Sequence, residues 1–317
     1  MFPRPNTPPE IATLKNGIKL SANQEKIRSC ASDVGPFLII EIPPPLTSFV
    51  PFLSIAISGG ILGLGNMVFT AALTAGVLQL LLIYGMLGIT GTYRLAGNAL
   101  RDLVLLLVCV VILIVCTNYT WSKGHPASTI SRGMGLFLLV LAVAFTVWML
   151  PYFMGKNRKL QRRPDTDFVP AIVFTLVGLA LAGLGGVLLM NNTAALTHAL
   201  NIEQGVLGFA VIGVGLVLPE YVRVARKYWM NTQKPVSMHL TLATGNLGLL
   251  LMVGLSAVIS PIIVTFAGAY LLLACVVAII VFGILFYVGD EVGKIKAILF
   301  LAGFALIFVL LMKFSLH

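Results

Sequence analysis

The feature of this sequence that most constrains its fold is a series of long apolar runs. They cover residues 36 to 58, 61 to 89, 103 to 117, 133 to 154, 168 to 190, 203 to 222, 238 to 259, 262 to 288 and 297 to 315. Most are close to the roughly 20 residues that a helix needs to cross a bilayer, and none alternates apolar and polar residues as a barrel strand does. A backbone in lipid must satisfy its own hydrogen bonds. The runs therefore predict an all-α, polytopic transmembrane helical bundle of about nine spans.

The composition agrees with a membrane environment. Hydrophobic residues make up 58% of the chain and charged residues 10%, whereas a soluble domain has about 25% charged residues. The formal net charge is +10, but the basic residues are concentrated in short loops, where they orient helices. We expect an integral, multi-pass membrane protein that contacts the lipid bilayer and binds no nucleic acid. The sequence carries no signal for a particular membrane or oligomeric state.

The loops divide the chain into four parts. Residues 1–35 form a polar, proline-containing N-terminal arm, and residues 156–167 form a basic loop near the midpoint. We expect a first, incomplete transmembrane repeat over 36–155 and a second over 168–317. If the spans alternate, the basic loops share one side, which the positive-inside rule assigns to the cytoplasm. Corresponding spans then run in opposite directions, so the two repeats are predicted to be inverted.

Two glutamates lie inside apolar runs and have similar surroundings. Glu41 precedes Asn66 by 25 residues and Glu220 precedes Asn246 by 26, and a glycine comes directly before each asparagine. An acid in lipid costs roughly 2.5 to 3.5 kcal/mol on insertion scales, so its presence in both halves indicates a function. Carboxylate and amide oxygens suit hard cations such as Ca²⁺ and Na⁺. These four residues are the candidate ligands of a transported cation.

Prolines interrupt the chain near both glutamates. Pro219 frees the carbonyl one turn earlier, which leaves a backbone oxygen near Glu220. Residues 43 to 45 are all proline, so the run that holds Glu41 is either a broken or re-entrant helix, or the remainder of a chain whose start is misassigned. For Glu220 the alternative is an interfacial carboxylate at the start of the basic loop that begins near Arg223.

Residues 171–261 resemble the second repeat of the calcium/cation antiporter superfamily, the sodium/calcium exchangers. The stretch LNIEQGVLGFAVIGVGLVLPE is similar to the family's G-T-S-L-P-E segment, and LATGNLGLLLMVGLSAVISPI is similar to its G-N-x-x-G-S-N-x-F-N helix. In the first half, ISGGILGLGNMVF resembles the matching Gly-Asn helix. The resemblance implies a ten-helix, inverted-repeat antiporter that works by alternating access. It also implies that Glu41 and Glu220 are the central carboxylates and that Asn66 and Asn246 supplement them.

The sequence departs from the family pattern in three places. Leu216 and Val217 stand where the pattern has hydroxyl residues, leucines 249 to 251 replace part of the second motif, and the residue directly before Glu41 is Ile40 rather than a proline. Fewer hydroxyl ligands would mean fewer bound ions, a preference for protons, or a loss of transport. The alternative function is therefore a degenerate, non-transporting relative that acts as a structural or regulatory membrane subunit.

The leading hypothesis is a secondary-active antiporter that exchanges Ca²⁺, or another cation, for Na⁺ or H⁺ at a carboxylate site near the membrane midplane. These inorganic cations are substrates, and no resident cofactor is expected. The sequence has no phosphate-binding loop, no Cys or His cluster with metal-ligand spacing, and no catalytic constellation, so we do not expect an enzyme. His198 and His239 are interpreted as helix-end residues at the interface.

Overall fold

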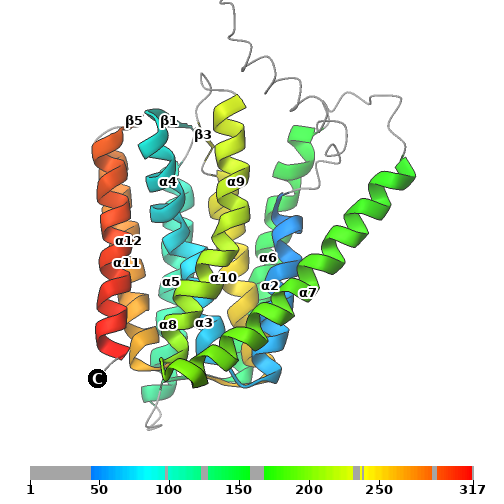
Figure 1. Ribbon diagram of the computed structural model, residues 1–317, viewed down its shortest axis with the longest axis vertical. Coiled ribbons are helices and arrows are strands. Elements are labelled where there is room, and N and C mark those ends of the chain that lie inside the picture. The colour runs from blue at the N-terminus through cyan, green and yellow to red at the C-terminus, as the bar shows by residue number, and fades with distance from the viewer. Residues whose placement is uncertain are drawn as a thin grey trace, which may run out of the picture. The chain divides into compact units, whose positions relative to one another are not determined.

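The apolar runs fold into long helices that lie side by side (Figure 1). The computed structural model describes residues 44–96, 99–122, 128–157, 168–230, 236–237, 239–287 and 291–315. Residues 42–317 form one unit, and residues 1–41 form another that lies outside the described residues. The predicted N-terminal arm, Glu41 and most of the basic loop 156–167 therefore have no structural description.

The helices and strands follow one another with short connections. The helices are α2 (Pro44–Ile61), α3 (Gly65–Leu73), η2 (Thr74–Leu78), α4 (Gln79–Thr90), α5 (Ala99–Ser122), α6 (Arg132–Asn157), α7 (Phe168–Leu200), α8 (Gln204–Leu207), η3 (Gly208–Gly213), α9 (Val214–Met230), α10 (His239–Ile259), α11 (Phe266–Tyr287) and α12 (Lys294–Ser315). The strands are β1 (Tyr93–Ala96), β2 (Thr129–Ile130), β3 (Val236–Ser237), β4 (Ile262–Ile263) and β5 (Glu291–Val292).

The described helices confirm the predicted class of an α-helical, integral membrane protein with several spans. Seven segments are long and apolar enough to cross a bilayer: Gly65–Thr90, Arg132–Met149, Leu176–Thr197, Gln204–Arg226, Thr241–Ile259, Phe266–Leu285 and Lys294–Lys313. Two shorter apolar helices cover Phe49–Ile61 and Asp102–Asn118. The expected number of nine spans remains a prediction, because these two segments are below the length of a full span.

Short strands connect the loops at the two ends of the bundle. At one end β1 pairs in parallel with β3 and antiparallel with β5, so the loops that precede α5, α10 and α12 meet. At the other end β2 pairs antiparallel with β4, which brings together the loops that precede α6 and α11. The first end carries the basic loops that the sequence assigns to the cytoplasm. The loops are thus grouped as the predicted alternation of spans requires.

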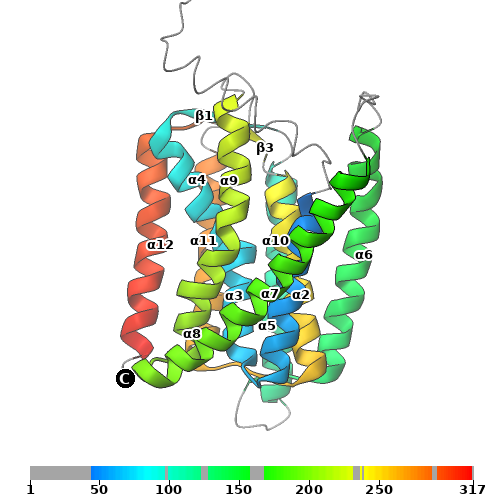
Figure 2. The same ribbon diagram turned by 45° about the vertical axis from the view of Figure 1, so that its right-hand side comes forward.

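The centre of the bundle consists of α10 and the continuous helix formed by α3, η2 and α4. Helix α10 packs against α2, α5, α6, α3 and η2, and nearly all of Gly65–Thr90 is buried. By contrast, α6, α7 and α12 lie at the periphery and expose apolar side chains, as expected of helices that face lipid. Helix α7 runs obliquely across α2 (Figure 2). The polar residues described below are held by the central helices.

Several of the packed helices are irregular, and two of the irregularities are prolines at corresponding places of the two halves. Helix α2 contains Pro51 and α9 contains Pro219, and each proline removes a backbone donor. Two helices pass through a π-helical segment, η2 in one and η3 in the other. Such segments occur often at functional sites, because they disturb the regular hydrogen-bond ladder. The irregular backbone is surrounded by other helices, as a membrane interior requires.

Candidate functional site

The two halves of the chain are related by a sequence repeat that becomes clear once the central helices are seen together. Residues 73–85, LTAGVLQLLLIYG, and residues 242–254, LATGNLGLLLMVG, match at an offset of 169 with seven identical positions. The first stretch runs from the β4 end of the bundle toward β1, and the second runs from β3 toward β4. The repeats are therefore inverted. This register makes Val77, and not Asn66, the counterpart of Asn246.

The matched stretches touch at a pair of glycines. A Cβ atom on Gly245 would lie 2.5 Å from the carbonyl oxygen of Gly76, and one on Gly76 would lie 3.2 Å from the carbonyl oxygen of Gly245. A side chain at either position would therefore push the two helices apart. Gly208 and Gly213 allow an equally close approach of η3 to Thr70 and Thr74. Small residues at such crossings let backbones approach closely within a membrane.

Buried polar side chains surround these crossings. They are Thr70 and Thr74 on α3 and η2, Gln79 at the start of α4, and Thr241, Thr244 and Asn246 on α10, each at most 2% exposed. The Nε2 of Gln79 donates to the carbonyl oxygen of Thr241 at 3.1 Å, which links the two repeats. The Oγ1 of Thr74 donates to the carbonyl oxygen of Thr70 at 2.9 Å. A layer of oxygen and amide groups thus lies between the central helices.

One oxygen of this layer, Oδ1 of Asn246, has no hydrogen-bond partner among the described residues. The phenol oxygen of Tyr84 and the hydroxyl of Thr241 lie close to each other and interact. An unsatisfied buried polar group costs about 1 to 3 kcal/mol, so it calls for a specific explanation such as a water or an ion. Amide and hydroxyl oxygens are ligands that hard cations accept. The layer is chemically suited to hold a cation.

Glu220 lies one residue after Pro219 inside α9 and is 4% exposed, so it does not extend to the surface as the interfacial alternative requires. Its carboxylate accepts hydrogen bonds from Nε of Arg223, at 2.9 Å, and from Nη2 of the same guanidinium. Glu220 and Arg223 both interact electrostatically with Tyr84, which connects them to the polar layer. The carboxylate is therefore buried, near the layer, and paired within its own helix.

The first repeat has an aromatic ring where the second has this carboxylate. Pro51 is followed by Phe52 in α2, as Pro219 is followed by Glu220 in α9. Phe52 is 3% exposed, and its ring lies against Gly248 of α10, where a Cβ would be 2.7 Å from the ring. Glu41, eleven residues earlier, lies outside the described residues. The pairing of Glu41 with Glu220 therefore stays a prediction.

Asn66 is placed away from Asn246 and belongs to a different set of contacts. Its Nδ2 donates to Oγ1 of Thr265 at 2.9 Å, and the Thr265 hydroxyl donates to Glu203 at 2.5 Å. Ten residues separate Asn66 from Gly76, which corresponds to about 15 Å along a helix. Asn66 thus connects the beginning of α3 to the loops before α8 and α11. These residues line a cavity of about 530 Å³.

The donor set of the polar layer contains few acids. Within the described ranges no three His, Cys, Asp or Glu side chains come together in a way that could hold a metal ion. Asp102 is buried in the first turn of α5, which packs on α10. Among the described residues, the groups identified at the layer that could bind a cation are the carboxylate of Glu220 and neutral oxygens. The sequence interpretation missed Gln79 and Thr241, whose hydrogen bond joins residues 162 positions apart and is found only from the fold.

Comparisons with known proteins agree with this architecture. No family model matches the chain. A curated relative from Alkalimonas amylolytica, named "Putative antiporter CaxA", is 24% identical over 147 residues, which are 46% of this chain and 46% of the relative. The chain thus matches less than half of that protein's length.

Solved structures of the sodium-calcium exchanger NCX_Mj are also similar. The crystal form soaked with 2.5 mM Na⁺ and 10 mM Sr²⁺ has a TM-score of 0.50 and 20% identity, over 87% of this chain and 88% of the exchanger. A structure without Na⁺ and Ca²⁺ has a TM-score of 0.49 and 19% identity, over 90% of both chains. The similarity to the first of these structures, at a TM-score of 0.50, indicates a shared fold. The resemblance to the calcium/cation antiporter superfamily is confirmed at the level of the fold.

Proposed function

We propose that this chain, which has the fold of the sodium/calcium exchangers, is a secondary-active cation antiporter. The observation that carries the proposal is the buried carboxylate of Glu220, which follows Pro219 near a layer of buried polar groups between two inverted repeats, among them the unpaired Oδ1 of Asn246. An ionisable group at this depth is costly, so its retention indicates a task. Broken helices and inverted repeats are the means by which many transporters bind an ion near the midplane.

The number of carboxylates bears on which ions are exchanged. Ca²⁺ takes six to eight oxygen ligands and is usually bound by several carboxylates. In the part of the chain that the structure describes, Glu220 is paired with Arg223, and Phe52 occupies the matching position of the other repeat. We therefore propose that H⁺ is one of the two exchanged ions and that a cation such as Na⁺ or Ca²⁺ is the other. A proton and a cation would compete for the same carboxylate, which couples their movements.

The pairing with Arg223 adds a step to this exchange. A bound cation and the guanidinium both favour the ionised carboxylate, and they compete for its oxygens. Cation binding therefore requires that the guanidinium move away from at least one oxygen of Glu220. The side chain of Arg223 is 30% exposed, so it is less tightly enclosed than the carboxylate and has room to move. Protonation of Glu220 would weaken its ion pair with Arg223 and return the site to its cation-free state.

The test is ion exchange in proteoliposomes that contain the purified protein. An imposed pH gradient should drive uptake of Na⁺ or Ca²⁺ by the wild type, and Glu220→Gln should abolish it. Gly185→Ala is the matched control, because a Cβ at Gly185 on the peripheral helix α7 meets nothing within 4 Å. Equal flux in the wild type and in Glu220→Gln would reject the mechanism. The same follows if the folded wild type moves none of the cations against any of the gradients.

A second candidate function is a non-transporting subunit. It is favoured by Phe52, whose ring fills the place opposite Gly248 where a symmetric exchanger would hold a second polar group. If the protein is such a subunit, neither the folded wild type nor Glu220→Gln transports cations faster than empty liposomes do. Flux in the wild type that depends on Glu220 excludes this candidate.

A further inference from the structure

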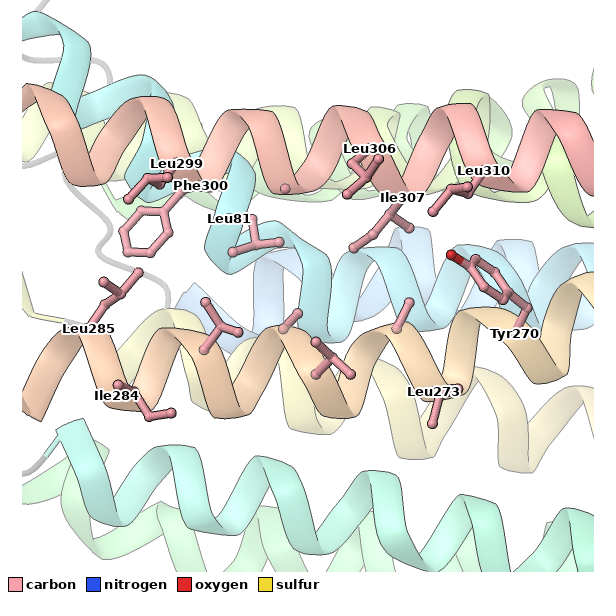
Figure 3. Close-up of a pocket in the computed structure, with 15 residues that line it drawn as sticks. Leu81, Tyr270, Leu273, Ile284, Leu285, Leu299, Phe300, Leu306, Ile307 and Leu310 are labelled. Carbon is pink, nitrogen blue, oxygen red and sulfur yellow. The ribbon is translucent and has the colours of Figure 1, made fainter.

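An apolar groove lies between α11 and α12, away from the polar layer. Figure 3 shows side chains from both helices that face one another across it, together with Leu81 of α4. The groove has a volume of about 490 Å³, within the range of about 300 to 1,000 Å³ that is typical of small-molecule sites. Its lining is almost entirely aliphatic and aromatic. No function proposed above uses this groove.

The groove opens toward the lipid-facing side of the bundle. Both helices that form it are long and apolar enough to span a bilayer. Many of the lining side chains are more than half exposed in the described structure: Leu273, Val277, Ile284, Leu299 and Leu306. In a membrane these side chains contact hydrocarbon, so water is not the occupant of the groove.

The length of the groove suits one acyl chain. It extends along α11 from Leu285 to Tyr270, and fifteen helical residues correspond to about 22 Å. One leaflet of a bilayer has a hydrocarbon thickness of roughly 15 Å, half of the usual 30 Å. A chain that enters at the Leu285 end can therefore lie in the groove over the full depth of its leaflet.

The Leu285 end of the groove carries positive charge. The Nζ of Lys296 donates to the carbonyl oxygen of Leu285 at 3.0 Å, which places an ammonium group at the mouth of the groove. Lys294, the first residue of α12, has an exposed side chain. The acid of this region, Glu291, lies opposite Arg94 in the strand ladder at the same end of the bundle. This is the end that the basic loops assign to the cytoplasm.

We propose that the groove binds one acyl chain of an anionic phospholipid, whose phosphate lies at Lys294 and Lys296. Basic groups at the cytoplasmic ends of transmembrane helices attract the anionic lipids of that leaflet, and basic pockets between helices bind their head groups. An apolar groove that ends at a positively charged mouth matches a phospholipid, in which an acyl chain is joined to a phosphate. The site is independent of cation transport.

The test is native mass spectrometry of the full-length protein in detergent with added phosphatidylglycerol or phosphatidylcholine. Gly303→Leu fills the groove, because Gly303 lines it and a Cβ there would meet only Leu81, at 3.9 Å. Gly283→Leu is the matched control on α11, outside the groove, where a Cβ meets nothing within 4 Å. Lys294→Gln removes one charge at the mouth, which we expect to weaken phosphatidylglycerol binding about fivefold.

The proposal predicts that phosphatidylglycerol binds more tightly than phosphatidylcholine, that Gly303→Leu removes its binding, and that Gly283→Leu retains it. Circular dichroism of each variant confirms that the helices are intact. Equal binding of the two lipids, or unchanged binding in Gly303→Leu, would overturn it. A dimer that dissociates on Gly303→Leu without loss of lipid would also overturn it, because the groove would then be an interface between copies.

Discussion

At the scale of single residues, the ion pair of Glu220 and Arg223 is the most consequential feature of the site. The carboxylate is 4% exposed and the guanidinium 30% exposed, and they lie three residues apart on one helix. Removing one member of a buried pair leaves the other charge without compensation, which is more damaging than removing both. We therefore expect the loss of either member alone to destabilise the fold more than the loss of both.

We predict that Arg223→Gln destabilises the protein by about 1 to 3 kcal/mol, less than the 3 to 5 kcal/mol of a fully buried pair because the guanidinium is partly exposed to polar surroundings. Adding Glu220→Gln to this variant should restore most of the loss. Thermal unfolding in detergent of the two single variants and the double variant measures the coupling. If the effects of the two substitutions simply add, the side chains do not act as a pair.

At the scale of elements, the crossing of η2 and α10 depends on Gly76 and Gly245. We predict that Gly245→Ala destabilises the protein by about 1 to 3 kcal/mol, because the new Cβ would collide with the Gly76 carbonyl and with Gln79. Gly178→Ala on α7 is the control, since a Cβ there has open space and alanine favours a helix by up to about 1 kcal/mol. Thermal unfolding compares the two variants, and equal stability would show that the helices do not approach as described.

The helices were predictable from the sequence because apolar runs of this length in lipid have few alternatives to a helix. For Glu220 the sequence left a buried and an interfacial position open, and its exposed fraction of 4% agrees with the buried one. The residues that contact each asparagine were not predictable from the sequence. A spacing of about 25 residues between Glu and Asn includes a loop, and the spacing does not determine the geometry of that loop. The repeat at offset 169 carries that information, and it relates Asn246 to Val77. Asn66 instead bonds with Thr265, which is remote in sequence and is found only from the fold.

At the scale of the whole molecule, the grouping of loops at two ends makes a prediction about sidedness. Gly293 precedes α12 at the basic end, and Gly133 begins α6 at the opposite end; a Cβ at either meets nothing within 4 Å. In a chain whose native cysteines are replaced by serine, Gly133→Cys should react with a membrane-impermeant thiol reagent applied to intact cells. Gly293→Cys should react only after permeabilisation. Reaction of both residues in intact cells would contradict the inverted topology.

The central claim is that Glu220 binds the transported cation, and equilibrium binding to purified protein tests it most directly. A cation that binds only the folded protein stabilises it by about 2.7 kcal/mol at a concentration one hundred times its Kd. We predict that Na⁺ or Ca²⁺ raises the unfolding temperature of the wild type and of Gly185→Ala, but not that of Glu220→Gln. Protons should reduce the rise, because they compete for the carboxylate. An equal rise in the wild type and in Glu220→Gln would contradict the claim.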